Sequence, residues 1–99
     1  MTGTDDNYVS VPYWYTLGTE EKSGELTISQ PESGNASSVH LLVAEEIARQ
    51  LKELNKVVVY EGRQITAGWV ERKFSLSSKV TVTAQAWSEP FQVSVYDAV

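Results

Sequence analysis

The stretch SSVHLLVAEEIARQLKELN, residues 37–55, decides the fold that we predict for this chain. Its apolar residues recur at steps of three and four and therefore share one face of a helix. They are Leu41, Ala44, Ile47, Ala48, Leu51 and Leu54. Asn35, Ser37 and Ser38 are candidate N-caps, because a short side-chain oxygen accepts a free backbone N–H. Asn55 suits the left-handed conformation that ends a helix.

Outside this helix the sequence is typical of strands and turns. Strand composition is aromatic and β-branched, or alternates apolar with polar residues. The expected strands are residues 8–17, 25–29, 57–60, 64–76, 79–87 and 91–96, with a charged turn at 18–24 and a bend at Gly68. The element order is therefore β-β-α-β-β-β-β. We predict an α+β two-layer sandwich, in which one long helix packs on a mostly antiparallel sheet of five to six strands.

This order, a hairpin followed by a helix and a strand, resembles the β-grasp, the ubiquitin-like fold. Residues 57–65 (VVVYEGRQI) resemble the apolar strand, glycine turn and basic residue that follow the helix in ubiquitin-like proteins. The chain departs from them because its helix runs straight into the strand and its sheet carries an extra strand. It also ends in residues 97–99 (DAV), without the diglycine tail needed for conjugation. The resemblance therefore implies a binding scaffold and not a protein modifier.

A second, shorter resemblance lies at residues 64–68 (QITAG). This segment is similar to the Q-x-V-x-G loop of cystatin protease inhibitors, and a long helix precedes it, as in that family. Thr66 stands where valine is expected, and the N-terminal hairpin has no counterpart there. We therefore carry no site residue over from this family.

Length and composition indicate a single domain over residues 1–99, with residues 1–7 flexible. The chain has no cysteine, which excludes a disulfide framework, a thiolate metal site and a cysteine nucleophile. We expect a cytoplasmic protein, because a cysteine-free chain fits a reducing compartment and the polar N-terminus does not resemble a signal peptide. No apolar run approaches the roughly 20 residues of a membrane span, so we expect no membrane partner.

Charge is distributed unevenly along the chain, whose net charge is −5. Residues 1–46 hold eight acidic residues and one basic residue, whereas residues 47–99 hold five acidic and seven basic residues. Such a distribution is ordinary for a soluble surface. It also fits an electrostatic dipole that orients a partner or a second copy of the chain.

Catalytic chemistry is poorly represented. His40 is the only histidine, and no serine is singled out as its nucleophile. Adjacent acidic pairs such as Glu45 and Glu46 diverge on a helix and form no carboxylate dyad. The glycines match no phosphate-binding loop or dinucleotide motif. We therefore expect no enzyme, no cofactor and no metal site.

Aromatic residues on polar strand faces are the better candidates for a binding site. Trp14 alternates away from Tyr13 and Tyr15 along its strand, and exposed tryptophan and tyrosine dominate interface energetics. The predicted binding residues are Trp69, Trp87, Tyr96, Lys73 and Arg63. The same rings are equally compatible with a second, minor core. Although basic residues near aromatics can bind nucleic acid, we do not expect that partner because the chain is acidic overall.

These observations lead to one functional hypothesis and one alternative. The hypothesis is a small, non-enzymatic protein-binding module, such as an adaptor, an assembly factor or a phage- or plasmid-type inhibitor. It would bind another protein through an exposed sheet face or an edge strand. The alternative is a self-associating structural protein of a viral or secretion assembly, which would be a homo-oligomer held together through strand edges.

Overall fold

The structure is a computed structural model that describes residues 7–99. Six strands and one long helix make up most of it, with a one-turn helix and a 3-10 turn between them. In chain order the elements are β1 (Tyr8–Leu17), β2 (Glu20–Ser29), α1 (Gln30–Ser33), α2 (Ala36–Lys52), β3 (Lys56–Tyr60), β4 (Arg63–Ile65), η2 (Leu76–Ser78), β5 (Val80–Ala86) and β6 (Glu89–Asp97). The predicted α+β class, the single long helix and the element order are confirmed, and the predicted flexible start falls almost entirely outside the described residues.

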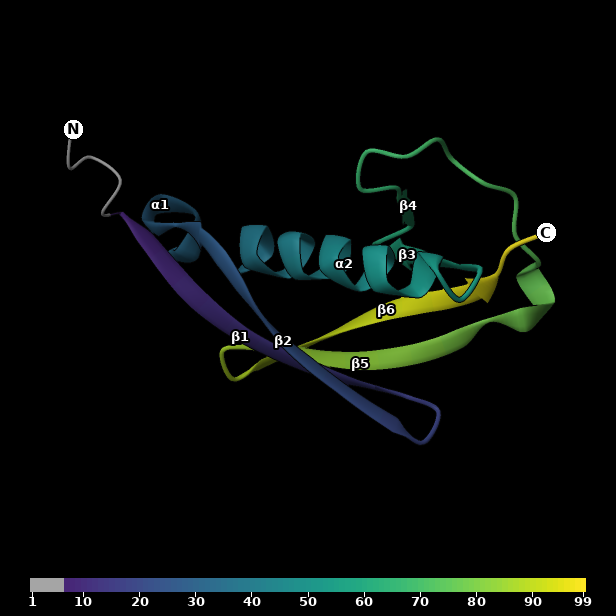
Figure 1. Cartoon of the computed structure of the whole chain (residues 1–99), viewed down its shortest axis with the longest axis horizontal. Helices are drawn as coiled ribbons and strands as arrows, with labels where there is room; N and C mark the ends of the chain where they lie inside the picture. The colour runs from purple at the N-terminus through teal and green to yellow at the C-terminus, as the bar shows by residue number, and fades with distance from the viewer. Residues whose placement is uncertain (1–6) are drawn as a thin grey trace.

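All six strands form one antiparallel sheet with the order β2-β1-β5-β6-β3-β4. Figure 1 shows the sheet curling beneath α2, with the long β1–β2 hairpin crossing obliquely under the helix. The two edges of the sheet are β2, which has ten residues, and β4, which has three. Among the described residues, no helix is long and apolar enough to cross a membrane.

Helix α2 begins after Asn35, one of the three candidate N-caps, but it ends at Lys52, before the predicted end at Asn55. Asn35 is the N-cap, and its side-chain oxygen accepts hydrogen bonds from the backbone N–H groups of Ser37 and Ser38 at 2.9 and 3.2 Å. Asn55 ends the turn after the helix with a φ of 60°, a conformation that asparagine tolerates better than most residues. The short connection that follows delivers the chain directly into β3.

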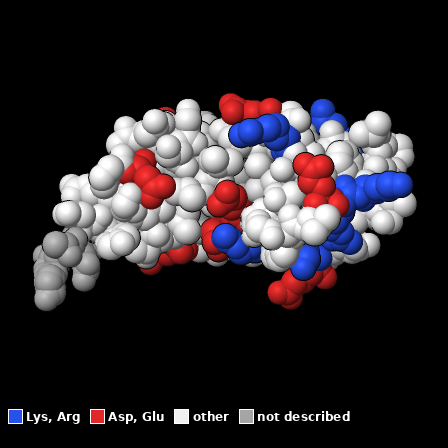
Figure 2. Space-filling model, turned by 90° about the horizontal axis from the view of Figure 1, so that it is seen from above, with Lys and Arg blue, Asp and Glu red and all other residues white. Residues whose placement is uncertain are grey.

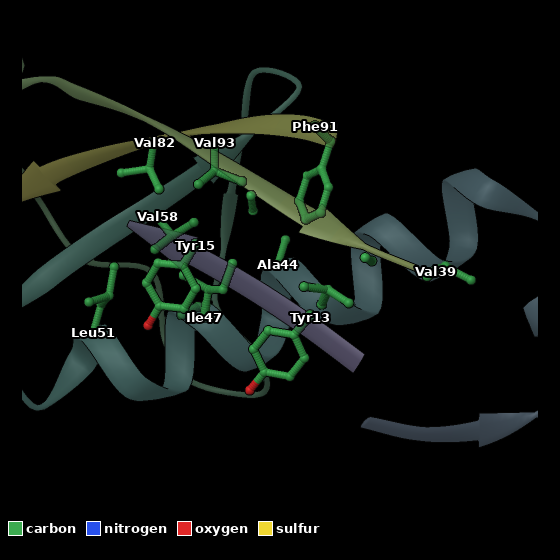
Figure 3. Close-up of a cluster of buried hydrophobic side chains, with 14 of the residues drawn as sticks. Tyr13, Tyr15, Val39, Ala44, Ile47, Leu51, Val58, Val82, Phe91 and Val93 are labelled. Carbon is green, nitrogen blue, oxygen red and sulfur yellow. The ribbon is translucent and has the colours of Figure 1, made fainter. Parts of the chain in front are cut away.

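The core lies between α2 and the inner, concave side of the sheet, where Figure 3 shows the side chains of both layers meeting. The buried helix residues are Val39, Val43, Ala44, Ile47, Ala48 and Leu51. The predicted face was therefore wrong at its two ends. Leu54 is 51% exposed because α2 has already ended at Lys52, and Leu41 is only half-buried at the margin of the core, while Val39 and Val43 take the central places.

Two tyrosines of β1 reach across the core to the helix. The Tyr15 hydroxyl donates to Oε1 of Gln50 at 2.6 Å, and Nε2 of Gln50 donates to the Tyr13 hydroxyl at 2.7 Å. Burial raises the pKa of Tyr15 to about 12, with smaller contributions from Tyr13 and Glu20, and burial likewise raises the pKa of Tyr13. The Gln50 amide thus satisfies two hydroxyls that would otherwise lose their solvation without compensation.

Gly24 lies opposite Tyr13 on β2 and explains why this strand has a glycine in its interior. A Cβ atom at this position would lie 2.6 Å from the Tyr13 hydroxyl oxygen and 2.8 Å from Cζ of the ring. The predicted turn over residues 18–24 is therefore too long. The actual turn is Gly18–Thr19, and the charged residues that follow are part of β2.

The predicted strand over residues 64–76 is wrong beyond Ile65. Thr66 to Trp69 form a tight turn in which Ala67 and Gly68 have φ values of 51° and 94°, and the backbone N–H of Trp69 donates to the carbonyl of Thr66 at 2.9 Å. The chain then runs as an irregular segment to η2. The side chain of Gln64 holds it, because its amide accepts from the N–H of Arg72 at 2.8 Å and donates to its carbonyl at 3.0 Å.

Candidate functional site

The convex side of the sheet, which α2 does not cover, is a candidate binding surface. Along β1, β5 and β6 the buried residues alternate with exposed or half-buried ones, so the second set points away from the helix. We call this side the outer face. It comprises Tyr8, Ser10, Pro12, Trp14 and Thr16 of β1; Glu21, Ser23, Glu25 and Thr27 of β2; Thr81, Thr83 and Gln85 of β5; and Pro90, Gln92, Ser94 and Tyr96 of β6.

Trp87 lies at the turn between β5 and β6 and is 40% exposed. Its φ is 59°, a left-handed conformation that glycine and asparagine adopt at much lower cost than a bulky residue. The backbone N–H of Trp87 donates to the carbonyl of Pro12 at 3.1 Å, which extends the β1–β5 pairing by one position. A large aromatic residue therefore occupies a place where local backbone energetics favour a small one.

Trp14 is also 40% exposed and lies in the middle of β1 on the outer face. It pairs with Gln85 of β5, and Trp87 follows two positions later, in the turn after β5 ends at Ala86. Trp14 was not among the predicted site residues, although its alternation against Tyr13 and Tyr15 already indicated this orientation.

The predicted strand over residues 64–76 would have placed Trp69 on the outer face, but Trp69 does not lie there. It follows the turn after β4, is 37% exposed, and its ring lies under the Lys52 ammonium of α2, with Nζ 4.2 Å from the ring centroid. This contact ties the end of the helix to the segment after β4. Because β4 ends at Ile65, Trp69 belongs to the irregular segment after that strand and does not lie beside Trp87.

Tyr96 does lie on the outer face, but it is half-buried. Its ring packs against Phe74 with the ring centroids 4.6 Å apart, because the chain around Phe74 bridges to Ala98 beside the end of β6. The seven steps from Glu89, next to the Trp87 turn, to Tyr96 span about 24 Å. Trp87 and Tyr96 therefore belong to opposite ends of the face.

The two basic residues of the predicted site lie apart: Arg63 pairs with Tyr60, whose ring contacts Phe91, whereas Lys73 lies at the same end as Tyr96. Arg63 is exposed at the start of β4, and Lys73 is exposed beside the C-terminal residues, where its carbonyl accepts from the N–H of Val99 at 3.0 Å. The structure thus brings Lys73 and Tyr96 into one region and leaves Trp87 with Trp14 in another. The five predicted residues do not form one contiguous site.

Charged side chains are distributed along the long axis of the molecule. In the view of Figure 2 the end that carries the N-terminus shows only acidic side chains, and the basic ones begin near the middle and extend toward the other end. Several basic residues already have partners there, since Lys56 pairs with Asp97 at 2.6 Å and Arg72 hydrogen-bonds the Asn55 side chain. On this face, acidic and basic side chains therefore lie together from the middle onward, and only acidic ones lie toward the N-terminal end.

Acidic side chains surround β2 in particular. They come from β2 itself and from the two helices, and they are Glu20, Glu21, Glu25, Glu32, Glu45 and Glu46. Two bases lie among them, and both are paired with an acid: Lys22 with Glu20 at 3.8 Å and Arg49 with Glu46. Six acids and two bases give this region a net charge of −4.

His40 packs as an aromatic ring. It stacks on Phe91 of β6 with the ring centroids 4.4 Å apart and an interplanar angle of 18°. Tyr60 approaches the same Phe91 edge-on at 5.8 Å. These contacts give His40 a packing role between the start of α2 and the sheet.

Neither a protein-family model, nor a curated protein, nor a solved structure matches this chain.

Proposed function

We propose that this chain is a small, non-enzymatic protein-binding module whose contact surface is the outer face around Trp14 and Trp87. The observation that carries this proposal is a pair of tryptophans that are each 40% exposed: Trp14 lies on the outer face, and Trp87 lies in the turn after β5, where its backbone bonds to Pro12 of β1. Tryptophan is the residue type most enriched among those that dominate binding energy.

Trp87 adds a second reason. A tryptophan at a φ of 59° costs on the order of 1–2 kcal/mol relative to glycine. The side chain does not recover the full benefit of burial, because it is 40% exposed. A residue that is costly to the backbone and incompletely buried in the free protein fits a side chain that becomes buried when a partner binds.

As its scaffold we propose a two-layer α+β sandwich whose element order resembles the β-grasp. We also propose the cytoplasmic location expected for a chain without cysteine. Adaptor, assembly factor and phage- or plasmid-type inhibitor are the roles open to such a module.

The experiment is a comparative affinity capture from the native host. Three immobilised proteins are compared: the wild type, the double variant Trp14→Ser/Trp87→Asn, and a control double variant, Val70→Ser/Leu76→Ser. Val70 and Leu76 are exposed apolar residues outside the outer face, so the control removes apolar surface without touching the tryptophan pair. We expect a protein that the wild type and the control retain and that the tryptophan variant loses.

Retention of every captured protein to the same extent by all three would contradict the proposal. The folded state of each variant is checked by far-ultraviolet circular dichroism. The captured protein is then produced separately and its binding is measured with purified components, which removes indirect capture as an explanation.

The second candidate function is self-association into a structural assembly. It is favoured by the long β2 edge together with the uneven distribution of acidic and basic side chains on the face in Figure 2. Light scattering at low and high salt tests it. A mass that doubles or more at low salt and falls at high salt supports self-association, whereas a monomer at both concentrations removes it.

A further inference from the structure

The two edges of the sheet differ in how far they are covered. At β4 the Gln64 side chain holds the following segment against the strand through two hydrogen bonds to the backbone of Arg72. At the other edge, within residues 7–99, β2 pairs with β1 alone along its whole length of ten residues. An edge of this length presents a row of backbone N–H and C=O groups to which another strand can pair.

The register identifies which residues of β2 present these groups. The backbone N–H of Gln30 donates to the carbonyl of Asn7 at 2.6 Å, just beyond the Tyr8–Ser29 pair. Hydrogen-bonded and non-hydrogen-bonded pairs alternate in an antiparallel ladder. The pairs that include Ile28, Leu26, Gly24 and Lys22 are therefore bonded to β1, and Pro12, which has no N–H, falls in a non-bonded pair with Glu25. The free groups belong to Glu21, Ser23, Glu25 and Thr27.

Two hollows lie along this edge. On the helix side, a groove of about 350 Å³ separates β2 from α2; its apolar lining includes Leu26, Ile28 and Leu42, and its acidic lining Glu32, Glu45 and Glu46. Near the hairpin end of the edge, a second hollow of about 360 Å³ is lined by Trp14, Tyr15, Thr16, Glu21, Lys22 and Ser23, and Lys22 is paired with Glu20. The unpaired backbone thus runs between a groove with apolar and acidic lining and a hollow with an aromatic ring and a carboxylate, and the one basic residue of each, Arg49 and Lys22, is paired with a glutamate.

We infer that the β2 edge binds an extended segment of a partner protein as a seventh strand, and that this segment alternates cationic and apolar residues. This inference rests on the proposed protein-binding function and names the chemistry of its partner. In an antiparallel added strand, residues opposite Glu21, Ser23, Glu25 and Thr27 point to the outer face, where Glu21, Glu25 and the Trp14 ring favour lysine or arginine. The intervening residues point into the groove, where Leu26, Ile28 and Leu42 favour valine or isoleucine.

Charge disfavours two other occupants of this edge, the β2 strand of a second copy and a nucleic acid. The region around β2 has a net charge of −4, so a second copy of β2 would bring two like-charged edges together. A nucleic acid backbone would be repelled for the same reason. A cationic segment is the partner that this field attracts and orients.

The test uses a fluorescein-labelled, end-capped octapeptide of alternating lysine and valine. It is titrated into the full chain at low salt and followed by fluorescence anisotropy. We expect saturable binding that weakens as salt rises. The block-ordered peptide with four lysines followed by four valines has the same composition, and we expect it to bind at least about tenfold more weakly, because it cannot match both faces of the edge.

Backbone methylation distinguishes edge pairing from simple charge attraction. In the proposed antiparallel pairing, the amides of the lysine residues donate to β2 and those of the valine residues point away. N-methylation of the lysine amides should abolish binding, and N-methylation of the valine amides should leave the affinity within about twofold. Equal affinities for the two methylated peptides would overturn the inference.

Charge-reversal variants locate the site on the protein. Glu21→Lys/Glu25→Lys should weaken binding by about tenfold or more. Glu61→Lys/Glu71→Lys makes the same change in net charge at the turn before β4 and in the segment after it, and should leave the affinity within about twofold. Both variants replace exposed side chains, so both should keep the wild-type circular dichroism spectrum.

Amide exchange gives a readout independent of affinity. Peptide binding should slow exchange at Glu21, Ser23, Glu25 and Thr27 and leave the amides of β4 unchanged. A peptide that fails to bind the wild type, or that binds the two charge-reversed proteins equally, overturns the inference. The proposed function fails separately, if the Trp14→Ser/Trp87→Asn variant captures the same proteins as the wild type.

Discussion

Replacement of Gly24 by alanine is a direct test of the packing between β2 and β1. The added methyl group would lie 2.6 Å from the Tyr13 hydroxyl oxygen and 2.8 Å from Cζ. Ordinary contact begins near 3.4 Å, so the ring must move by about 0.6–0.8 Å. The hydroxyl is held by the 2.7 Å hydrogen bond from Gln50, and the ring is buried, so this displacement strains the core.

The expected cost follows from three terms. Overpacking a core costs about 1–3 kcal/mol, and weakening the Gln50 hydrogen bond costs up to about 1 kcal/mol more. The lower entropy of alanine in the unfolded chain offsets about 0.4–1 kcal/mol of this. We expect Gly24→Ala to lower the free energy of unfolding by about 1–3 kcal/mol, which corresponds to a fall in Tm of roughly 5–20 °C for a domain of this size.

Urea unfolding followed by circular dichroism measures this change. Gly34→Ala is the matched control, because Gly34 has a φ of −81° and a methyl group added there would have the Pro31 carbonyl oxygen as its nearest neighbour, at 3.7 Å. In Gly24→Ala/Tyr13→Leu, where the ring is gone, the loss should be smaller than the sum of the two single losses. A Gly24→Ala protein as stable as the wild type, or as Gly34→Ala, would refute the packing described for Tyr13.

Three further predictions concern Trp87, the buried tyrosines and Gln64. Trp87→Asn should change the free energy of unfolding by less than about 1 kcal/mol, because relief of the left-handed strain offsets lost apolar contact; a loss of 3 kcal/mol or more in urea unfolding would identify Trp87 as core instead. Because the pKa of Tyr15 rises to about 12 on folding from its ordinary value of 10.0, the stability that its protonated form contributes is complete below pH 10 and is lost as the pH rises toward 12. Two pKa units correspond to on the order of 2–3 kcal/mol, so unfolding free energies measured from pH 9 to 12 should fall less steeply for Tyr15→Phe than for the wild type, and parallel profiles would contradict this. Gln64→Ala should accelerate amide exchange of Arg72 by about tenfold, because it removes the hydrogen bond that this N–H donates; an unchanged rate would show that the segment after β4 is held by other contacts.

The helix and the alternating strands were predictable because their signals are local. The cap at Asn35 depends on side chains within a few residues, and the alternation along β1 and β5 is a property of single strands. Strand β1 is an example. Its alternation correctly sets Trp14 against the buried Tyr13 and Tyr15.

The errors arose where distant residues decide the structure. Gly24 resembles a turn residue until Tyr13 is placed opposite it, and residues 66–75 resemble a strand until the Gln64 side chain is seen to hold them as an irregular segment. Only the fold makes the predicted Trp69 a neighbour of Lys52, and only the sheet register pairs Trp14 with Gln85, two positions before Trp87. The acidic surroundings of β2 likewise depend on α1 and α2 lying beside the edge strand.

We propose that the outer face around Trp14 and Trp87 binds another protein. Isothermal titration calorimetry with the purified partner from the comparative capture tests it most directly, using the wild type, Trp14→Ser/Trp87→Asn and Val70→Ser/Leu76→Ser. Loss of two interface tryptophans should cost at least about 2 kcal/mol, or roughly a 30-fold rise in Kd, with the control within about twofold of the wild type. The same Kd for all three folded proteins would contradict the claim.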